Sequence, residues 1–179
     1  MRVVHVCYAA FAIALAAGSA AAEQSKSLRD FLMHYRCPVV DRLDRIYEAG
    51  DHASHRDRFL ALTVPEHPHG YVQCMFFDRR KKMLCEASSG FYYDKPGTER
   101  TMYLAPEAVA ALGRLGFSTD DSQGNFSIEF PVADPPDLNA IADLMLKALH
   151  DGYGARADTK LKFSAPFARR ATTKCIPVS

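Results

Sequence analysis

Four histidines form the densest group of potential metal ligands in the chain. His52 and His55 are three residues apart, and His67 and His69 flank a proline in a short polar segment. Neutral imidazole rings suit copper, nickel or zinc. Nothing in the sequence places the two segments together, and polar loops tolerate histidine for no special reason. We therefore predict no metal site and no cofactor, with a periplasmic metal-binding protein as an alternative function.

The residue types that could carry nucleophilic catalysis lack the spacing that the chemistry needs. Ser88-Ser89-Gly90 does not match the Gly-x-Ser-x-Gly elbow that exposes a catalytic serine. Cys37 lies close to His34 in the sequence, but a disulfide is its expected fate, and the Asp120-Asp121 pair lies in a polar turn. The sequence therefore predicts no catalytic residue and no enzyme. A small hydrolase with an unrecognised site is the second alternative.

Residues 1–22 have the three-part pattern of a cleavable signal peptide. Arg2 supplies a positive start, Cys7–Ala17 is apolar, and Ala20–Ala22 offers small side chains just before Glu23. The apolar run is about half of the ~20 residues needed to span a bilayer. We expect cleavage after Ala22, a periplasmic or secreted protein, and no membrane span.

The charge balance argues against a nucleic-acid partner. Removing residues 1–22 takes away Arg2 and no acidic residue, which leaves 21 Lys+Arg against 21 Asp+Glu in the mature chain. Proteins that neutralise many phosphates are usually basic overall. The 48% hydrophobic and 24% charged content is that of an ordinary globular domain.

The even number of cysteines in the mature chain favours disulfides in an oxidising compartment. These residues are Cys37, Cys74, Cys85 and Cys175. A two-residue hairpin loop at Arg79-Arg80 would place Cys74 opposite Cys85, whereas a four-residue loop would leave the two sulfurs diagonal. We predict a Cys74–Cys85 disulfide, and a Cys37–Cys175 disulfide by exclusion.

The spacing of apolar residues predicts an α+β fold. Leu28 to Tyr47 has a helical period, with Ser27 as N-cap and Pro38 as a kink or the start of a second helix. Three strands follow, predicted at 59–64, 71–77 and 83–93. A short helix from Pro106, a hairpin of 117–119 with 125–130, and a helix capped by Asp137 complete the pattern.

This order, α-β-β-β-α-β-β-α, predicts an antiparallel sheet with helices on one face. We divide the chain into a signal peptide at 1–22, an α+β domain at 23–154 and a basic C-terminal tail at 155–179. The tail carries six Arg or Lys residues against the single acid Asp158, and one strand is expected at 160–163. Its cations either lie on an anionic membrane surface or protect an edge strand.

The element order resembles the type III secretion chaperone-like fold, including its relatives outside secretion systems. The closest local match is 112–153, where a leucine-x-x-leucine-glycine helix end at 112–116 precedes a short hairpin and a terminal amphipathic helix. In topology the resemblance covers most of 27–154. It implies a partner-binding rather than a catalytic protein. Its members are typically acidic cytoplasmic dimers, whereas this chain is neutral and carries an export signal.

A sheet covered by helices on one face leaves its other face for water, a partner or a second subunit. Along the second strand Val72, Cys74 and Phe76 alternate with Tyr71, Met75 and Phe77, and aromatic residues follow at 91–93. We predict that Met75, Phe77 and Tyr93 bind a protein or peptide partner or mediate self-association. The alternative is that the basic tail folds over this face and completes the core.

Overall fold

The computed structural model describes residues 7–49, 57–67, 69–94, 98–99, 103–168 and 175, with side chains from residue 22 onward. The elements in chain order are α1 (Cys7–Glu48), β1 (Phe59–Thr63), β2 (Tyr71–Phe77), β3 (Lys82–Ala87), α2 (Pro106–Arg114), β4 (Phe126–Pro131), α3 (Leu138–Tyr153), β5 (Lys162–Ser164) and the short 3₁₀ helix η2 (Pro166–Ala168). The α+β class and the predicted order are confirmed. The first arm of the small hairpin is a single bridge between Ser118 and Ser127.

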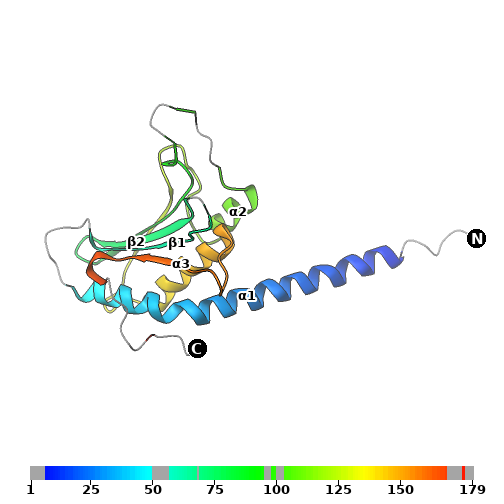
Figure 1. Ribbon diagram of the computed structural model, residues 1–179, viewed down its shortest axis with the longest axis horizontal. Coiled ribbons are helices and arrows are strands. Elements are labelled where there is room, and N and C mark those ends of the chain that lie inside the picture. The colour runs from blue at the N-terminus through cyan, green and yellow to red at the C-terminus, as the bar shows by residue number, and fades with distance from the viewer. Residues whose placement is uncertain are drawn as a thin grey trace, which may run out of the picture.

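The five strands form one antiparallel sheet in the order β4-β3-β2-β1-β5. Burial alternates along β1, β2 and β3, so every second side chain enters the core. Helices α1 and α3 cover that face of the sheet (Figure 1). The core residues supplied by the strands are Leu60, Leu62, Val72, Cys74, Phe76, Met83, Cys85, Ala87 and Phe126.

Helix α1 is longer than the sequence pattern predicts. It begins at Cys7, so Ser27 lies inside it and is not its N-cap, and Pro38 neither ends the helix nor starts a second one. The N-terminal half extends away from the rest of the molecule (Figure 1). Among the described helices, none has an apolar stretch long enough to cross a membrane.

The C-terminal half of α1 packs against α3 through an apolar face and polar contacts. Its buried residues recur three or four positions apart, as one helix face requires, and are Phe31, Tyr35, Val39, Leu43, Ile46 and Tyr47. Arg36 donates two hydrogen bonds to the Asp143 carboxylate, at 2.6 and 2.9 Å. The two helices are therefore held together by burial and by a bidentate ion pair.

The predicted N-cap of α3 is confirmed. The Asp137 side chain accepts a hydrogen bond from the backbone N–H of Ala140, and Gly154 ends the helix in the left-handed conformation at φ 71°. Gly152 lies within the helix, where a Cβ atom would come within 3.1 Å of Leu112. This glycine lets α2 and α3 approach closely.

The β2–β3 hairpin has the register of a two-residue loop. Cys74 faces Cys85 and Phe77 faces Lys82, and the Lys81 N–H donates to the Asp78 carbonyl at 3.1 Å. The Cys74–Cys85 disulfide is present, with its Cα atoms 4.1 Å apart. Arg79 and Arg80 have φ of 55° and 69°, so both loop residues take the conformation that normally selects Asn or Gly.

Strand β3 ends at Ala87, and the prediction that it continues to residue 93 is wrong. Beyond Ala87 the backbone turns away at Gly90, which has φ 87°, and Tyr93 N–H donates to the Gly90 carbonyl. Ser89 Oγ donates to the Gly124 carbonyl and accepts from Phe91 N–H. These hydrogen bonds, one of them to the distant Gly124, replace the sheet ladder and place Tyr93 in a turn.

The described part of the tail belongs to the sheet and the helical layer. β5 pairs with β1, and the Phe163 ring faces α1, where the Arg42 guanidinium lies 4.2 Å from its centroid. The predicted Cys37–Cys175 disulfide is also present, and joins the tail to α1.

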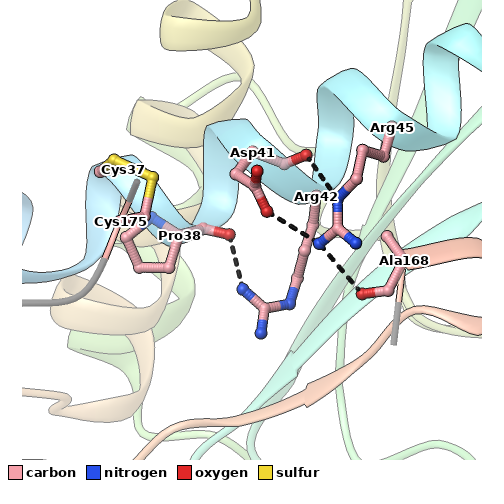
Figure 2. A network of polar contacts seen from close by, with 7 residues as sticks. All are labelled: Cys37, Pro38, Asp41, Arg42, Arg45, Ala168 and Cys175. Atoms are coloured by element: carbon pink, nitrogen blue, oxygen red, sulfur yellow. Dashed lines mark hydrogen bonds and ion pairs between the residues drawn. A yellow bond between two sulfur atoms is a disulfide. The ribbon is translucent and has the colours of Figure 1, made fainter. Parts of the chain in front are cut away.

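Side chains on the next turns of α1 make further contacts (Figure 2). Arg42 donates to the Pro38 carbonyl at 2.8 Å. Arg45 pairs with Asp41 at 2.8 Å and donates to the Ala168 carbonyl at 3.4 Å. The tail residues after β5 that the structure describes thus lie beside α1, on the helical side of the sheet.

Candidate functional site

The sheet face that points away from α1 and α3, which we call the open face, carries a group of large apolar side chains. Phe59, Met75 and Leu84 lie in one row across β1, β2 and β3, and Phe77 follows Met75 along β2. All four are partly exposed, whereas Phe76 on the opposite face is 2% exposed. We call these four residues the apolar patch.

The patch is contiguous because of the strand register. Opposed residues on antiparallel strands have Cβ atoms about 4.5–5.5 Å apart, so the residues of the row are direct neighbours across the sheet. The described tail residues do not cover the patch, because β5 extends the sheet and η2 lies beside α1. The predicted residues Met75 and Phe77 therefore share one accessible surface.

The other end of the open face is polar. Gln73 donates to the Glu86 carboxylate at 2.5 Å across β2 and β3. The Asn125 side-chain amide donates to the Tyr71 hydroxyl oxygen at 2.6 Å, and burial is the main cause of the raised pKa of Tyr71. The open face thus has an apolar half next to the β2–β3 turn and a hydrogen-bonded half at the start of β2.

Charged residues border the apolar half. Lys82 pairs with Glu129 at 2.8 Å, and this hydrogen bond raises the pKa of the lysine. The Lys82 ammonium also lies 5.7 Å from the centroid of the Phe77 ring. The cation of Lys82 therefore lies directly beside the apolar patch.

The structure does not bring Tyr93 together with Met75 and Phe77. Tyr93 is 46% exposed, and its ring contacts that of His69 at 4.3 Å, in the region where β2 begins. Phe77 is the last residue of β2. At about 3.3 Å per residue, the length of the strand separates the two ends by roughly 20 Å.

Sequence reasoning missed an apolar hollow of about 320 Å³ between the end of β4 and the start of α3. Its lining residues are Phe130, Pro131, Val132, Ala133, Asp137, Ala140 and Ile141. The available signal was the proline-rich segment between a strand and a capped helix. Pro131 is opposite Lys82 in the sheet, so the hollow lies at the β4 edge of the sheet, near the end of the apolar patch that borders Lys82.

The structure describes two of the four histidines, His67 and His69. His52 and His55 lie outside the described residues. His67 packs edge-on against the Tyr153 ring and lines a polar hollow of about 350 Å³, while His69 contacts Tyr93. Within the described ranges, no three His, Cys, Asp or Glu side chains are arranged to hold a metal ion.

A hydrogen-bonded chain of serine, histidine and aspartate connects α1 to α3. His150 is 2% exposed; its Nε2 lies 3.2 Å from Ser27 Oγ and its Nδ1 lies 2.6 Å from Asp151 Oδ1. Ser27 lies inside a continuous helix, where backbone N–H groups are bonded within the helix, rather than at a strand–helix elbow. We interpret the chain as a polar link between the two helices.

The described residues thus form a one-layer antiparallel sheet with helices on one face and an apolar patch on the other. The profile of the family described as TY-Chap3, "T3SS (YopN, CesT) and YbjN peptide-binding chaperone 3", matches residues 41–167. Because the match covers most of the chain, this protein belongs to that family of peptide-binding chaperones. The predicted resemblance to type III secretion chaperones is confirmed. No curated protein and no solved structure matches the chain.

Proposed function

We propose that this protein is an exported, non-catalytic chaperone-like domain that binds a protein or peptide through the open face of its sheet. The observation that carries the proposal is the apolar patch, with Met75 and Phe77 as its principal contacts. Aromatic residues and methionine dominate protein interfaces, and contiguous apolar patches on soluble proteins commonly mark binding sites. Membership of a peptide-binding chaperone family supports this assignment.

We place the protein in the periplasm or outside the cell. The signal-like pattern of residues 1–22 and the two disulfides support this location. Disulfides persist in oxidising compartments and are rare in the cytosol. A bound partner would then be another exported protein, a segment of one, or a second copy of this chain. In this proposal Tyr93 is a separate contact, at the far end of β2 from Phe77.

Phe77→Asp tests the open face, because a carboxylate cannot be desolvated cheaply in an apolar interface. We expect the variant to lose self-association in sedimentation experiments, or to lose partner capture from a periplasmic extract. Its near-ultraviolet circular dichroism should stay native, because Phe77 lies outside the core. Tyr103→Asp is the matched control, since Tyr103 is an exposed aromatic residue (65%) outside the strands of the sheet.

The opposite result would assign the open face to the core of the fold. A protein that is strictly monomeric, retains no partner, and unfolds on Phe77→Asp contradicts the proposal.

A further inference from the structure

We propose that the segment bound on the apolar patch carries acidic residues next to its apolar ones, and that the tip of the β2–β3 hairpin recognises them. This inference rests on the proposed function and specifies the chemistry of the partner. The tip consists of Asp78, Arg79, Arg80 and Lys81, followed by Lys82 at the start of β3. Four cations against one carboxylate make it a compact positive surface.

The backbone of the tip takes a conformation that its residues disfavour. Asp78, Arg79 and Arg80 have φ of 48°, 55° and 69°. The left-handed region costs a residue with a side chain roughly 1 kcal/mol or more relative to glycine, and hairpins of this type normally carry Asn-Gly. Arginines at both loop positions thus keep positive charge where uncharged residues would fold more favourably.

Two of the four cations are engaged within the protein. Arg80 donates to the Tyr47 carbonyl at 3.1 Å, and its guanidinium lies 4.6 Å from the centre of the Tyr47 ring. Lys82 pairs with Glu129. These contacts join the base of the tip to α1 and to β4.

The other two cations, Arg79 and Lys81, are exposed. Within the described part of the chain, neither side chain makes a hydrogen bond or an ion pair. Arginine binds carboxylates through two parallel hydrogen bonds, and lysine attracts them as a point charge. These two side chains are therefore available to an acidic partner.

The tip and the apolar patch form one continuous surface. Phe77 immediately precedes the turn, and the Lys82 ammonium lies over its ring. A bound segment in extended conformation advances about 3.3 Å per residue. If an apolar side chain of the bound segment packs against Phe77, a carboxylate one to three residues further along that segment lies within reach of Arg79 or Lys81.

Three synthetic peptides that differ only in charge test the inference. Each would carry the same apolar half, Val-Thr-Phe-Thr-Leu, preceded by Asp-Glu-Asp, Asn-Gln-Asn or Lys-Arg-Lys. By fluorescence anisotropy at 25 mM salt we expect the acidic peptide to bind about tenfold more tightly than the neutral one, because exposed ion pairs contribute modestly. The difference should largely disappear at 500 mM salt, where charges are screened.

The variant Arg79→Glu/Lys81→Glu should abolish or reverse the preference for the acidic peptide. Arg114→Glu/Lys160→Glu changes two exposed cations elsewhere by the same net charge and should leave the preference intact. The neutral change Phe77→Ser should weaken all three peptides to a similar extent. Dependence on Phe77 thus reports on the open face, and dependence on Arg79 and Lys81 reports on the tip.

Equal binding of the acidic and basic peptides, no measurable binding of the acidic one, or a preference that survives the double reversal would each overturn the inference. Tighter binding of phosphatidylglycerol vesicles than of the acidic peptide would overturn it as well, and would assign the tip to anionic membranes. If binding depends on the tip but not on Phe77, the proposed function fails while the charge recognition stands.

Discussion

High pH should destabilise this fold through its buried tyrosine residues. Tyr153 is 4% exposed and donates to the Ser88 carbonyl at 2.5 Å. Burial is the main cause that raises the pKa of Tyr153 far above its usual value, and it also raises the pKa of Tyr35 and Tyr71. In each case the folded state holds the neutral form and keeps its proton longer than the unfolded chain does.

We predict that stability is constant with respect to these groups below about pH 10 and falls above it. Above that pH the unfolded chain releases tyrosine protons that the folded protein retains, so the free energy of unfolding decreases as pH rises. Tyr153→Phe should cost about 1–2 kcal/mol at pH 8, because the Ser88 carbonyl loses its donor, and should make the alkaline decline shallower. Urea unfolding between pH 8 and 11 measures both effects.

Tyr103→Phe serves as the control for this experiment, because Tyr103 is 65% exposed whereas Tyr153 is buried. An alkaline decline with the same slope in Tyr153→Phe as in the parent protein would contradict the interpretation.

Among the elements, the β2–β3 hairpin carries positive charge at loop positions where Asn or Gly would be more stable. Its register places Cys74 opposite Cys85, and Arg80 donates a hydrogen bond to the Tyr47 carbonyl. Arg79 has a positive φ and lacks such a contact within the described residues. Local strain of this kind often accompanies a binding role.

Arg79→Asn should therefore stabilise the protein by about 0.5–1 kcal/mol, because asparagine tolerates the left-handed conformation better than arginine. The same variant should weaken binding of the acidic peptide. Lys81→Asn, where φ is not positive, should change stability by less than about 0.5 kcal/mol. Thermal and urea unfolding measure the difference, and a destabilised Arg79→Asn variant would show that the turn is not strained by its side chain.

The Cys37–Cys175 disulfide joins two elements that are far apart in the chain. With a separation of 138 residues it closes a long loop, and in the chain-entropy model its loss should cost about 5 kcal/mol. Cys37→Ser/Cys175→Ser should show this loss in urea unfolding under non-reducing conditions. Free energies of unfolding that differ by less than about 1 kcal/mol would mean that the contacts of β5 and η2 hold the tail without it.

For the whole molecule, the position of the tail determines what the open face can do. The chain after α3 continues the sheet through β5 and then returns to α1 at η2 and Cys175. The described tail therefore extends the sheet with β5 and adds contacts to α1. The described part of the tail therefore leaves the apolar patch uncovered.

The first residue of the purified protein tests whether the chain is exported and cleaved. We expect protein recovered from the extracytoplasmic fraction to begin at Glu23, because Ala20 and Ala22 are the small residues that signal peptidase reads. N-terminal sequencing of the purified protein checks this, with Ala22→Pro as a variant that should block cleavage. Full-length chain recovered only from the cytosol would contradict export.

Sequence alone determined the features that depend on near neighbours. The periods of the strands and helices, the Asp137 cap and the Gly154 stop are local, because each is decided within one or two turns of chain. The Cys74–Cys85 pairing was predicted for a two-residue loop, but the sequence left the loop length open, and the register of the structure decided it.

Only the tertiary structure decided the features that join distant segments. Ser27 meets His150 across 123 positions, and Phe163 meets Arg42 across the layer between β5 and α1. Tyr93 leaves the sheet because Ser89 bonds to Gly124, a partner that no local pattern reveals. Such pairings depend on the free energy of the whole packed chain, and so does the face of the sheet that remains open.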